Sequence, residues 1–375
     1  GYNSENGNFK PLPFSFDRAS SATVVNKEGL IETVGSGEPK IDYKDDSKGA
    51  LLLEPTRTNL IDESNNLTSV WGNYNFSGAN MTEQFGFLSP DGSNNATRLT
   101  YTNTSTGDGG SLLTRNLTLV ASAQYTISFY AKHVSGTKQI RVDLRNSSSG
   151  GASGSLFTLT NQWKRYTKTV TNASITNGGV QFRILDSEYA GDRTFDVWGV
   201  QLEQGSYATS YIPTSGGAVT RVADACNNAG NEQVINSTEG VLYFEGSVDK
   251  KVMSSLGLSD GSGVYNNTVA ILFNLDSINQ ITSIYRSNNI TTFSTVPLPL
   301  NFNKIAIRYF SNTLELWLNG VMVGSETFTT QIASNVLNSF QFEKSNNTLP
   351  FYGNTKDVRV YNTALTDQEL INLTT

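Results

Sequence analysis

Acidic side chains are the first groups to consider for catalysis, because hydrolysis of a glycosidic bond usually needs two carboxyl groups about 5–10 Å apart. Three candidates, Glu315, Glu343 and Asp357, are scattered over the C-terminal part of the chain, each near a predicted strand or turn. We interpret all three as solvated acids on strand faces. The sequence therefore predicts no catalytic residue and no enzyme activity.

Thiol and metal chemistry have equally little support. Cys226 is the only cysteine and His133 the only histidine, and they fall in different predicted domains. A catalytic thiol needs a nearby base, so we expect no nucleophile here, and His133 should be an edge or core residue. No cofactor is predicted except calcium, which stays open because oxygen ligands leave little trace in a sequence. Asp192 and Asp196 are the only pair that we single out as weak calcium candidates.

Saccharide binding requires less, namely an aromatic ring that stacks on the sugar and planar polar groups that bond its hydroxyls. Apolar and polar residues alternate over residues 124–132, 140–144 and 180–184, which predicts strands with one buried face. The residues predicted to point outward on these strands are Tyr130, Lys132, Arg141, Asp143, Arg145, Gln181 and Arg183. If the strands share a sheet, this polar face could bind a saccharide. A solvated face or a subunit contact with ion pairs is the alternative.

The tryptophans divide by the same reasoning. Trp198 alternates with apolar neighbours and Trp163 begins a strand, so both are expected in or at the edge of a core. Trp317 opposes the apolar face of its strand and should point outward, where it would contact a sugar or another subunit. Trp71 lies in an Asn/Gly-rich segment with Tyr74. This segment either packs or contributes both rings to a ligand site.

Period-2 alternation recurs along the chain, whereas helical periodicity is almost absent. Short alternating strands separated by Gly/Ser/Asn clusters are typical of antiparallel sandwiches. We predict an all-β chain with two antiparallel jelly-roll β-sandwiches in tandem, at residues 61–215 and 236–375. Residues 1–60 are interpreted as an extended leader with one hairpin, and residues 216–235 as a linker.

Two local signals predict particular structures. Asn319 and Gly320 both tolerate positive φ, which favours a two-residue hairpin turn. Thr366 is followed three residues later by Glu369, and this capping box predicts one short helix near the C-terminus.

Composition limits the partners. The chain has 375 residues, only 16% of them charged, and a net charge of −6. This charge disfavours nucleic acid, because binding it needs a basic patch. No apolar run reaches the roughly 18–20 residues of a membrane-spanning helix, so no membrane insertion is predicted. A lone cysteine excludes an intrachain disulfide, which fits folding in a reducing cytoplasm.

Several segments of the first 225 residues resemble one group of proteins. Residues 16–23 (FDRASSAT), 29–32 (GLIE) and 52–60 (LLEPTRTNL) are similar to the leader of many bacteriophage fibre and head-spike proteins. Residues 198–205 (WGVQLEQG) and 208–214 (ATSYIPT) resemble the close of their carbohydrate-binding-module-like sandwich.

The C-terminal part resembles the concanavalin-A-like, laminin-G-type jelly roll. The resemblance is carried by residues 304–307 (KIAI), 314–320 (LELWLNG) and 357–365 (DVRVYNTAL). Glucanases of that superfamily place their acids on one strand as Glu-x-Asp-x-x-Glu, and no such string occurs here. Such sandwiches host binders, enzymes and structural modules alike, so the fold does not fix a function.

The resemblances imply three competing functions. The first is a non-enzymatic virion fibre or spike of a bacteriophage, made in the host cytoplasm, exposed on the virion surface, and binding host cell-surface carbohydrate. The second is a structural or decoration protein of the virion without glycan binding. The third is a polysaccharide depolymerase, which the missing carboxylate pair disfavours.

The resemblances also imply a homo-oligomer, most simply a trimer, because phage fibres are usually three-fold. Other virion proteins would be contacted through the leader. The apolar run at residues 51–53 has no core of its own in this interpretation. A neighbouring subunit would then supply one.

Overall fold

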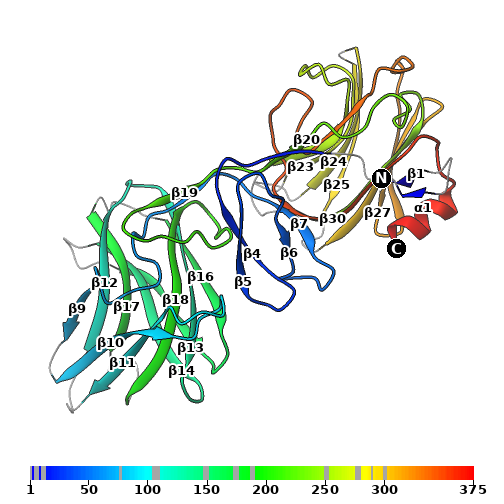
Figure 1. Cartoon of the computed structure of the whole chain (residues 1–375). Helices are drawn as coiled ribbons and strands as arrows, with labels where there is room; N and C mark the ends of the chain where they lie inside the picture. The colour runs from blue at the N-terminus through cyan, green and yellow to red at the C-terminus, as the bar shows by residue number, and fades with distance from the viewer. Residues whose placement is uncertain are drawn as a thin grey trace. The chain divides into compact units, whose positions relative to one another are not determined.

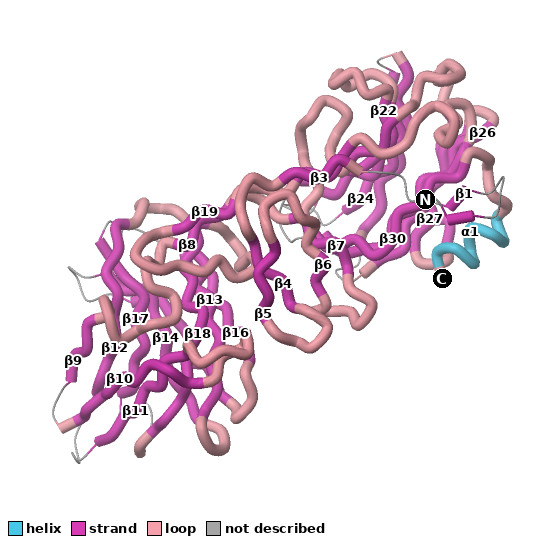
Figure 2. Tube along the Cα trace, in the orientation of Figure 1, coloured by secondary structure: helices cyan, strands magenta, loops and turns pink. Residues whose placement is uncertain are grey.

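The computed structural model has two compact units, and the regular secondary structure of the described residues is β apart from one short helix (Figure 1, Figure 2). Unit 1 comprises residues 1–19, 35–55 and 223–375, and unit 2 comprises residues 20–34 and 56–222. The predicted all-β class with sandwich architecture is confirmed. The structure describes residues 2–3, 8–9, 14–75, 78–103, 110–146, 152–171, 177–185, 191–248, 253–274, 280–288, 290–298 and 302–375.

Unit 2 is a sandwich of two five-stranded antiparallel sheets. The β13 sheet has the order β10 (Ala79–Phe87), β11 (Ala96–Asn103), β18 (Arg193–Gln204), β13 (Gln124–His133) and β16 (Lys164–Thr171). The β14 sheet has the order β15 (Ala152–Leu159), β14 (Lys138–Asn146), β17 (Asn177–Leu185), β12 (Gly110–Thr118) and β9 (Gly72–Asn75). The core residues from β14 and β17 are at most 1% exposed, as the alternation predicted: Ile140, Val142, Leu144, Val180, Phe182 and Ile184.

A second apolar cluster lies on the other side of the β13 sheet. Trp198 is 1% exposed, so its predicted burial is confirmed, but it packs there against Tyr211 with ring centroids 4.4 Å apart. Val200, two residues on, belongs to the sandwich core instead. Gly199 between them has a φ of +63°, and this bulge shifts the alternation by one residue.

Unit 1 is also a sandwich, with sheets of seven and five antiparallel strands. The seven-stranded sheet has the order β28 (Val321–Thr327), β27 (Thr313–Leu318), β26 (Asn303–Phe310), β21 (Gly240–Val248), β30 (Gly353–Tyr361), β7 (Ala50–Leu53) and β6 (Ile41–Asp42). The five-stranded sheet has the order β25 (Ile290–Pro297), β24 (Gln280–Ser287), β23 (Thr268–Asn274), β22 (Met253–Ser259) and β29 (Ser339–Gln341). Asn319 and Gly320 have positive φ between β27 and β28, which confirms the predicted turn.

The first 60 residues do not stand apart as a leader. β7 pairs with β30 inside the seven-stranded sheet, and Leu53 is 1% exposed in the core of unit 1. The hairpin of β4 (Ala22–Val25) and β5 (Ile31–Val34) belongs to unit 2 instead. The apolar run at residues 51–53 thus contributes to unit 1 itself. This removes one reason to expect an oligomer, and the oligomeric state stays a prediction.

The segment expected to be a linker is paired with residues near the N-terminus. β19 (Val219–Arg221) pairs with β8 (Arg57–Asn59) in unit 2, and β20 (Ala225–Asn227) pairs with β3 (Ser15–Asp17) in unit 1. A two-residue pair of β1 (Tyr2–Asn3) with β2 (Asn8–Phe9) precedes them. Residues 216–235 therefore do not form one free linker.

Four charged side chains of unit 1 form a buried ionic cluster: Arg18, Lys40, Glu54 and Asp224. Asp224 Oδ1 lies 3.0 Å from Arg18 Nη1, and its Oδ2 lies 2.9 Å from Lys40 Nζ. Lys40 also pairs with Glu54, and the four side chains are at most 4% exposed. The two positive and two negative charges balance, so no buried charge in the cluster lacks a counter-ion.

The C-terminal helix α1 (Asp367–Thr374) explains the largest departure from the predicted surface. It starts with the predicted capping box, in which Thr366 Oγ1 accepts from the Glu369 N–H and the Glu369 carboxylate accepts from the Thr366 N–H. Leu370 packs over Trp317, which is only 4% exposed. The prediction that Trp317 faces solvent is therefore wrong. No helix in the described part of the chain is long and apolar enough to cross a membrane.

Candidate functional site

The outer face of the β14 sheet brings together several residues that were predicted to bind a saccharide. Arg141 on β14 lies directly opposite Arg183 on β17, and Asp143 lies opposite Gln181. β12 links β17 to β9, so the row through the two arginines continues to Tyr74. Directly opposed residues on one face have Cβ atoms about 5 Å apart. These strands are neighbours in one sheet, which Figure 1 shows as part of unit 2.

Asp143 holds both arginines in place. Its Oδ1 accepts from Arg141 Nε and its Oδ2 accepts from Arg183 Nη1, each at 2.9 Å. The Asp143 side chain is fully buried, whereas the arginine side chains are 27% and 24% exposed. Among the described side chains of this face, one carboxylate thus binds two guanidinium groups. The arrangement presents donors whose side chains are already ordered.

Two buried polar atoms on this face have no hydrogen-bond partner. Gln181 is 5% exposed and its Oε1 accepts no hydrogen bond, while Arg183 Nε donates none. Roughly 90% or more of buried backbone polar groups, and most buried side-chain polar atoms, are paired in folded proteins. Because Gln181 Oε1 and Arg183 Nε are both buried, a ligand on this face would meet the exposed parts of the two arginines instead.

Exposed apolar groups flank the arginines. Tyr74 is 52% exposed at one end of the row, and Leu156 on β15, opposite Arg141, is 47% exposed at the other. Leu156 was not among the predicted residues, although alternation along residues 152–159 could have identified it. Arg145 lies further along β14, and its side chain falls outside the described residues.

The structure separates two other aromatic candidates from this face. Tyr130 lies on the β13 sheet, where it packs edge-on against Trp198 with ring centroids 5.5 Å apart. Trp71 is 8% exposed, packs against Phe182 in the core, and donates from Nε1 to the Glu63 carbonyl at 3.2 Å. Neither Tyr130 nor Trp71 is therefore an exposed ring on the candidate face.

The calcium candidates do not form a site. Asp196 is 1% exposed and accepts from Arg98 Nε at 2.7 Å and Nη2 at 3.1 Å, with Lys132 Nζ at 3.8 Å. These cations already neutralise its carboxylate, and Asp192 is exposed. The described residues contain no group of three His, Cys, Asp or Glu side chains that could hold a metal ion.

The two groups considered for nucleophilic chemistry lie in different units. Burial raises the pKa of the Cys226 thiol to about 12. Burial lowers the pKa of His133, so in this residue too the neutral form is favoured. A thiolate needs a lowered pKa to be reactive near neutrality. The surroundings of Cys226 therefore favour the unreactive thiol.

The three scattered carboxylates of unit 1 differ in their surroundings. Glu315 is 8% exposed and accepts from Arg308 Nε at 2.8 Å, so the expectation that it is solvated is wrong. Asp357 is bound by Arg359. Burial raises the pKa of Glu343, which accepts from Asn227 Nδ2 at 2.8 Å.

Two families match the chain. Residues 59–187 match the carbohydrate binding domain family, and residues 248–371 match the concanavalin A-like lectin/glucanases superfamily. The expected carbohydrate-binding-module-like sandwich and concanavalin-A-like jelly roll are confirmed. The candidate face lies within the first matched segment.

Similar solved structures include carbohydrate-binding modules and a pentraxin. The Ruminococcus gnavus IT-sialidase CBM40 shares 16% identity, with a TM-score of 0.34, over 40% of this chain and 94% of its own. The family 11 module from Clostridium thermocellum, bound to a β-1,3-1,4-mixed-linked tetrasaccharide, shares 17% identity, with a TM-score of 0.30, over 42% and 99%. A heptameric SAP-like pentraxin from Limulus polyphemus shares 9% identity, with a TM-score of 0.31, over 39% and 72%. These scores are too low to support an inference about ligands. A search of curated proteins finds no match.

Proposed function

We propose that the chain is a non-enzymatic fibre or spike on the surface of a bacteriophage virion, and that it binds host cell-surface carbohydrate. The binding part rests on the outer face of the β14 sheet, where Asp143 fixes Arg141 and Arg183 in a row that ends at the exposed ring of Tyr74. The match of residues 59–187 to a carbohydrate binding domain supports the same class of ligand.

The proposed contacts follow from the chemistry of a sugar ring. Tyr74 stacks on the apolar face of the ring, as aromatic side chains do in saccharide sites. The exposed parts of the Arg141 and Arg183 guanidinium groups donate to the hydroxyls of the ring. Because Asp143 already orders the guanidinium groups, little side-chain entropy is lost on binding.

The virion part of the proposal rests on the resemblance of residues 16–23, 52–60 and 198–214 to phage fibre and spike proteins. Such a protein is proposed to be a homotrimer that contacts other virion proteins. One open sheet face gives a weak single site. Three copies that engage one cell surface together would bind much more tightly through avidity.

A glycan array and a host-cell adsorption assay test the proposal with matched variants. Tyr74→Ala and Arg183→Gln should each weaken binding about tenfold, which corresponds to about 1.4 kcal/mol. Phe85→Ala is the control for the aromatic, since Phe85 is 42% exposed on the β13 sheet. Arg165→Gln is the control for the charge, because Arg165 also lies on that sheet. Both controls should bind like the unmodified chain.

Three outcomes would contradict parts of the proposal. Absence of binding to any glycan and to host cells would favour the structural or decoration role. An equal loss of glycan binding in the control variants and the test variants would show that the binding site is not specifically on the outer face of the β14 sheet. Release of reducing ends or unsaturated sugars from host polysaccharide would show an enzyme.

A further inference from the structure

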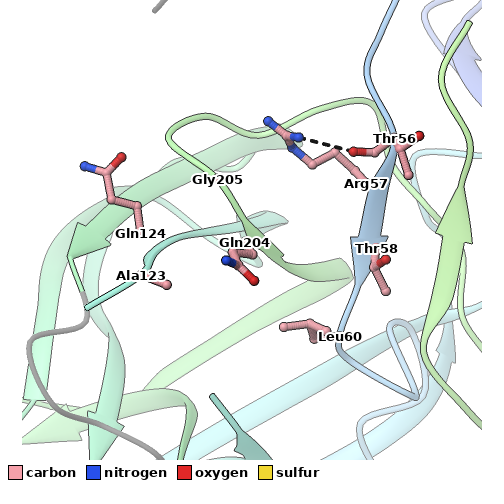
Figure 3. A pocket seen from close by; sticks show the side chains of 8 residues that line it. All are labelled: Thr56, Arg57, Thr58, Leu60, Ala123, Gln124, Gln204 and Gly205. Carbon is pink, nitrogen blue, oxygen red and sulfur yellow. Dashed lines mark hydrogen bonds between the residues drawn. The ribbon is translucent and has the colours of Figure 1, made fainter. Parts of the chain in front are cut away.

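A polar pocket in unit 2 lies away from the β14 sheet. Its volume is about 550 Å³, within the range of about 300–1,000 Å³ that is usual for small-molecule sites. Figure 3 shows that it is lined from β8 and the residue before it, from the turn that precedes β13, and from the end of β18. The polar side chains of the lining are Thr56, Arg57, Thr58, Gln124 and Gln204.

Arg57 brings an uncompensated charge to this pocket. Its Nη1 donates to the Thr56 carbonyl at 3.2 Å, and its Cζ lies 5.3 Å from the ring centroid of Tyr207. Its Nε is buried without an acceptor. No carboxylate pairs with it among the described residues, and none of the eight lining residues is acidic.

Gly205 lets the guanidinium lie against the backbone. A Cβ at this position would come within 3.0 Å of Arg57 Nη2 and 3.1 Å of Nε. The guanidinium is therefore half-buried at the edge of a cavity rather than extended into solvent. A partly desolvated cation without a counter-ion attracts anions more strongly than one in bulk water.

We propose that this pocket binds the carboxylate of an acidic saccharide, as a second subsite of the chain. The planar guanidinium matches a carboxylate in shape and donor spacing. Gln124 and Gln204 each offer a donor and an acceptor for ring hydroxyls, and Leu60 adds apolar lining. The proposal rests on the proposed function only for the class of ligand, because the two sites share no residue.

Calorimetric titration with methyl β-D-glucuronide and methyl β-D-glucoside tests this subsite. The unmodified chain should bind the glucuronide about tenfold or more tightly than the neutral sugar, as expected for one charge-assisted contact. Arg57→Gln should remove this preference. Arg165→Gln is the matched control and should keep it. Arg165 resembles Arg57 in two respects: its Cζ lies 5.5 Å from the ring centroid of Tyr130, and its buried Nε has no acceptor. Unlike Arg57, it does not line the pocket.

A thermal melt of each variant checks folding. If Arg57→Gln melts early, Gln204→Leu tests the pocket instead, because Gln204 is exposed. Gln204→Leu should weaken the binding of both glycosides and preserve the preference for the glucuronide over the glucoside. Unchanged binding by a folded Gln204→Leu would overturn the pocket assignment.

The remaining outcomes separate this subsite from the β14-sheet face. Equal affinity of the unmodified chain for the two glycosides overturns the subsite and leaves the face untouched. If Arg183→Gln loses the preference for the glucuronide and Arg57→Gln keeps it, the β14-sheet face binds the glucuronide carboxylate. This result also overturns the proposed subsite at Arg57. Displacement of the glucuronide by acetate at equal concentration overturns the saccharide assignment. Failure of Tyr74→Ala to change array binding affects only the proposed function.

Discussion

The buried ionic cluster of unit 1 gives the most direct test of the fold. Asp224→Asn keeps the shape of the side chain and removes its charge. Asp224 contacts Arg18 Nη1 at 3.0 Å and Lys40 Nζ at 2.9 Å, and its Oδ2 accepts from the Glu54 N–H at 2.8 Å. Without this carboxylate, two fully buried cations share the single charge of Glu54. Breaking a buried ion pair in this way costs about 3–5 kcal/mol.

A change of this size corresponds to a fall of about 6–20 °C in melting temperature for a unit of 150–250 residues. Differential scanning calorimetry should show the transition of unit 1 moving while that of unit 2 stays in place. Asp357→Asn is the matched control, because the Asp357–Arg359 pair of the same unit is 30% and 45% exposed and such pairs contribute only about 0–1 kcal/mol. If both variants melted at the same temperature, the cluster would not stabilise unit 1 as argued.

Three further predictions concern unit 1. Trp317→Ala should lower its melting temperature, at a cost of about 3–5 kcal/mol for a buried large aromatic under Leu370, and leave array binding unchanged; normal melting with lost binding would contradict the structure. Glu343→Gln should raise the melting temperature near neutral pH and give no gain in acid. Burial raises the pKa of Glu343, so the folded state loses stability as the pH rises past the ordinary pKa of a glutamate. A glutamine at this position has no charge to bury, and its side-chain oxygen can still accept the hydrogen bond from Asn227. Cys226 should resist iodoacetamide until denaturant is added, because it is 3% exposed and its pKa is raised to about 12; a native adduct in the mass spectrum would refute this.

Local signals in the sequence predicted local structure well. The turn at Asn319 and Gly320 and the capping box of Thr366 and Glu369 depend on residues that are near one another in the chain, and both are confirmed. Alternation also placed Trp317 on the correct side of its strand, opposite the sandwich core. It could not show that a helix about 50 residues later in the chain covers that side. Burial by a distant segment is a tertiary property that no local pattern carries.

The candidate face was also predictable only in part, because alternation predicts which way a side chain points but not which strands are neighbours. Alternation indicated that Arg141, Asp143 and Arg183 point away from the core, since that depends only on the two-residue period of a strand. Whether their strands are neighbours depends on strand order and register, which are long-range properties. The structure makes Arg141 and Arg183 direct partners and places Tyr130 on the opposite sheet. Register therefore decides which outward residues can bind one ligand together.

Asp143 and Asp224 each pair with two cations, and the exposure of those cations distinguishes the two aspartates. Asp224 pairs with Arg18 and Lys40, whose side chains are both 0% exposed, so a ligand cannot reach these charges. Asp143 pairs with two arginines that remain about a quarter exposed. The carboxylate is fully buried in both cases, and it fixes the cations in both. Around Asp143, unlike around Asp224, the ordered cations still meet solvent, and that is why the β14 sheet, rather than the ionic cluster, is the face that we propose for sugar binding.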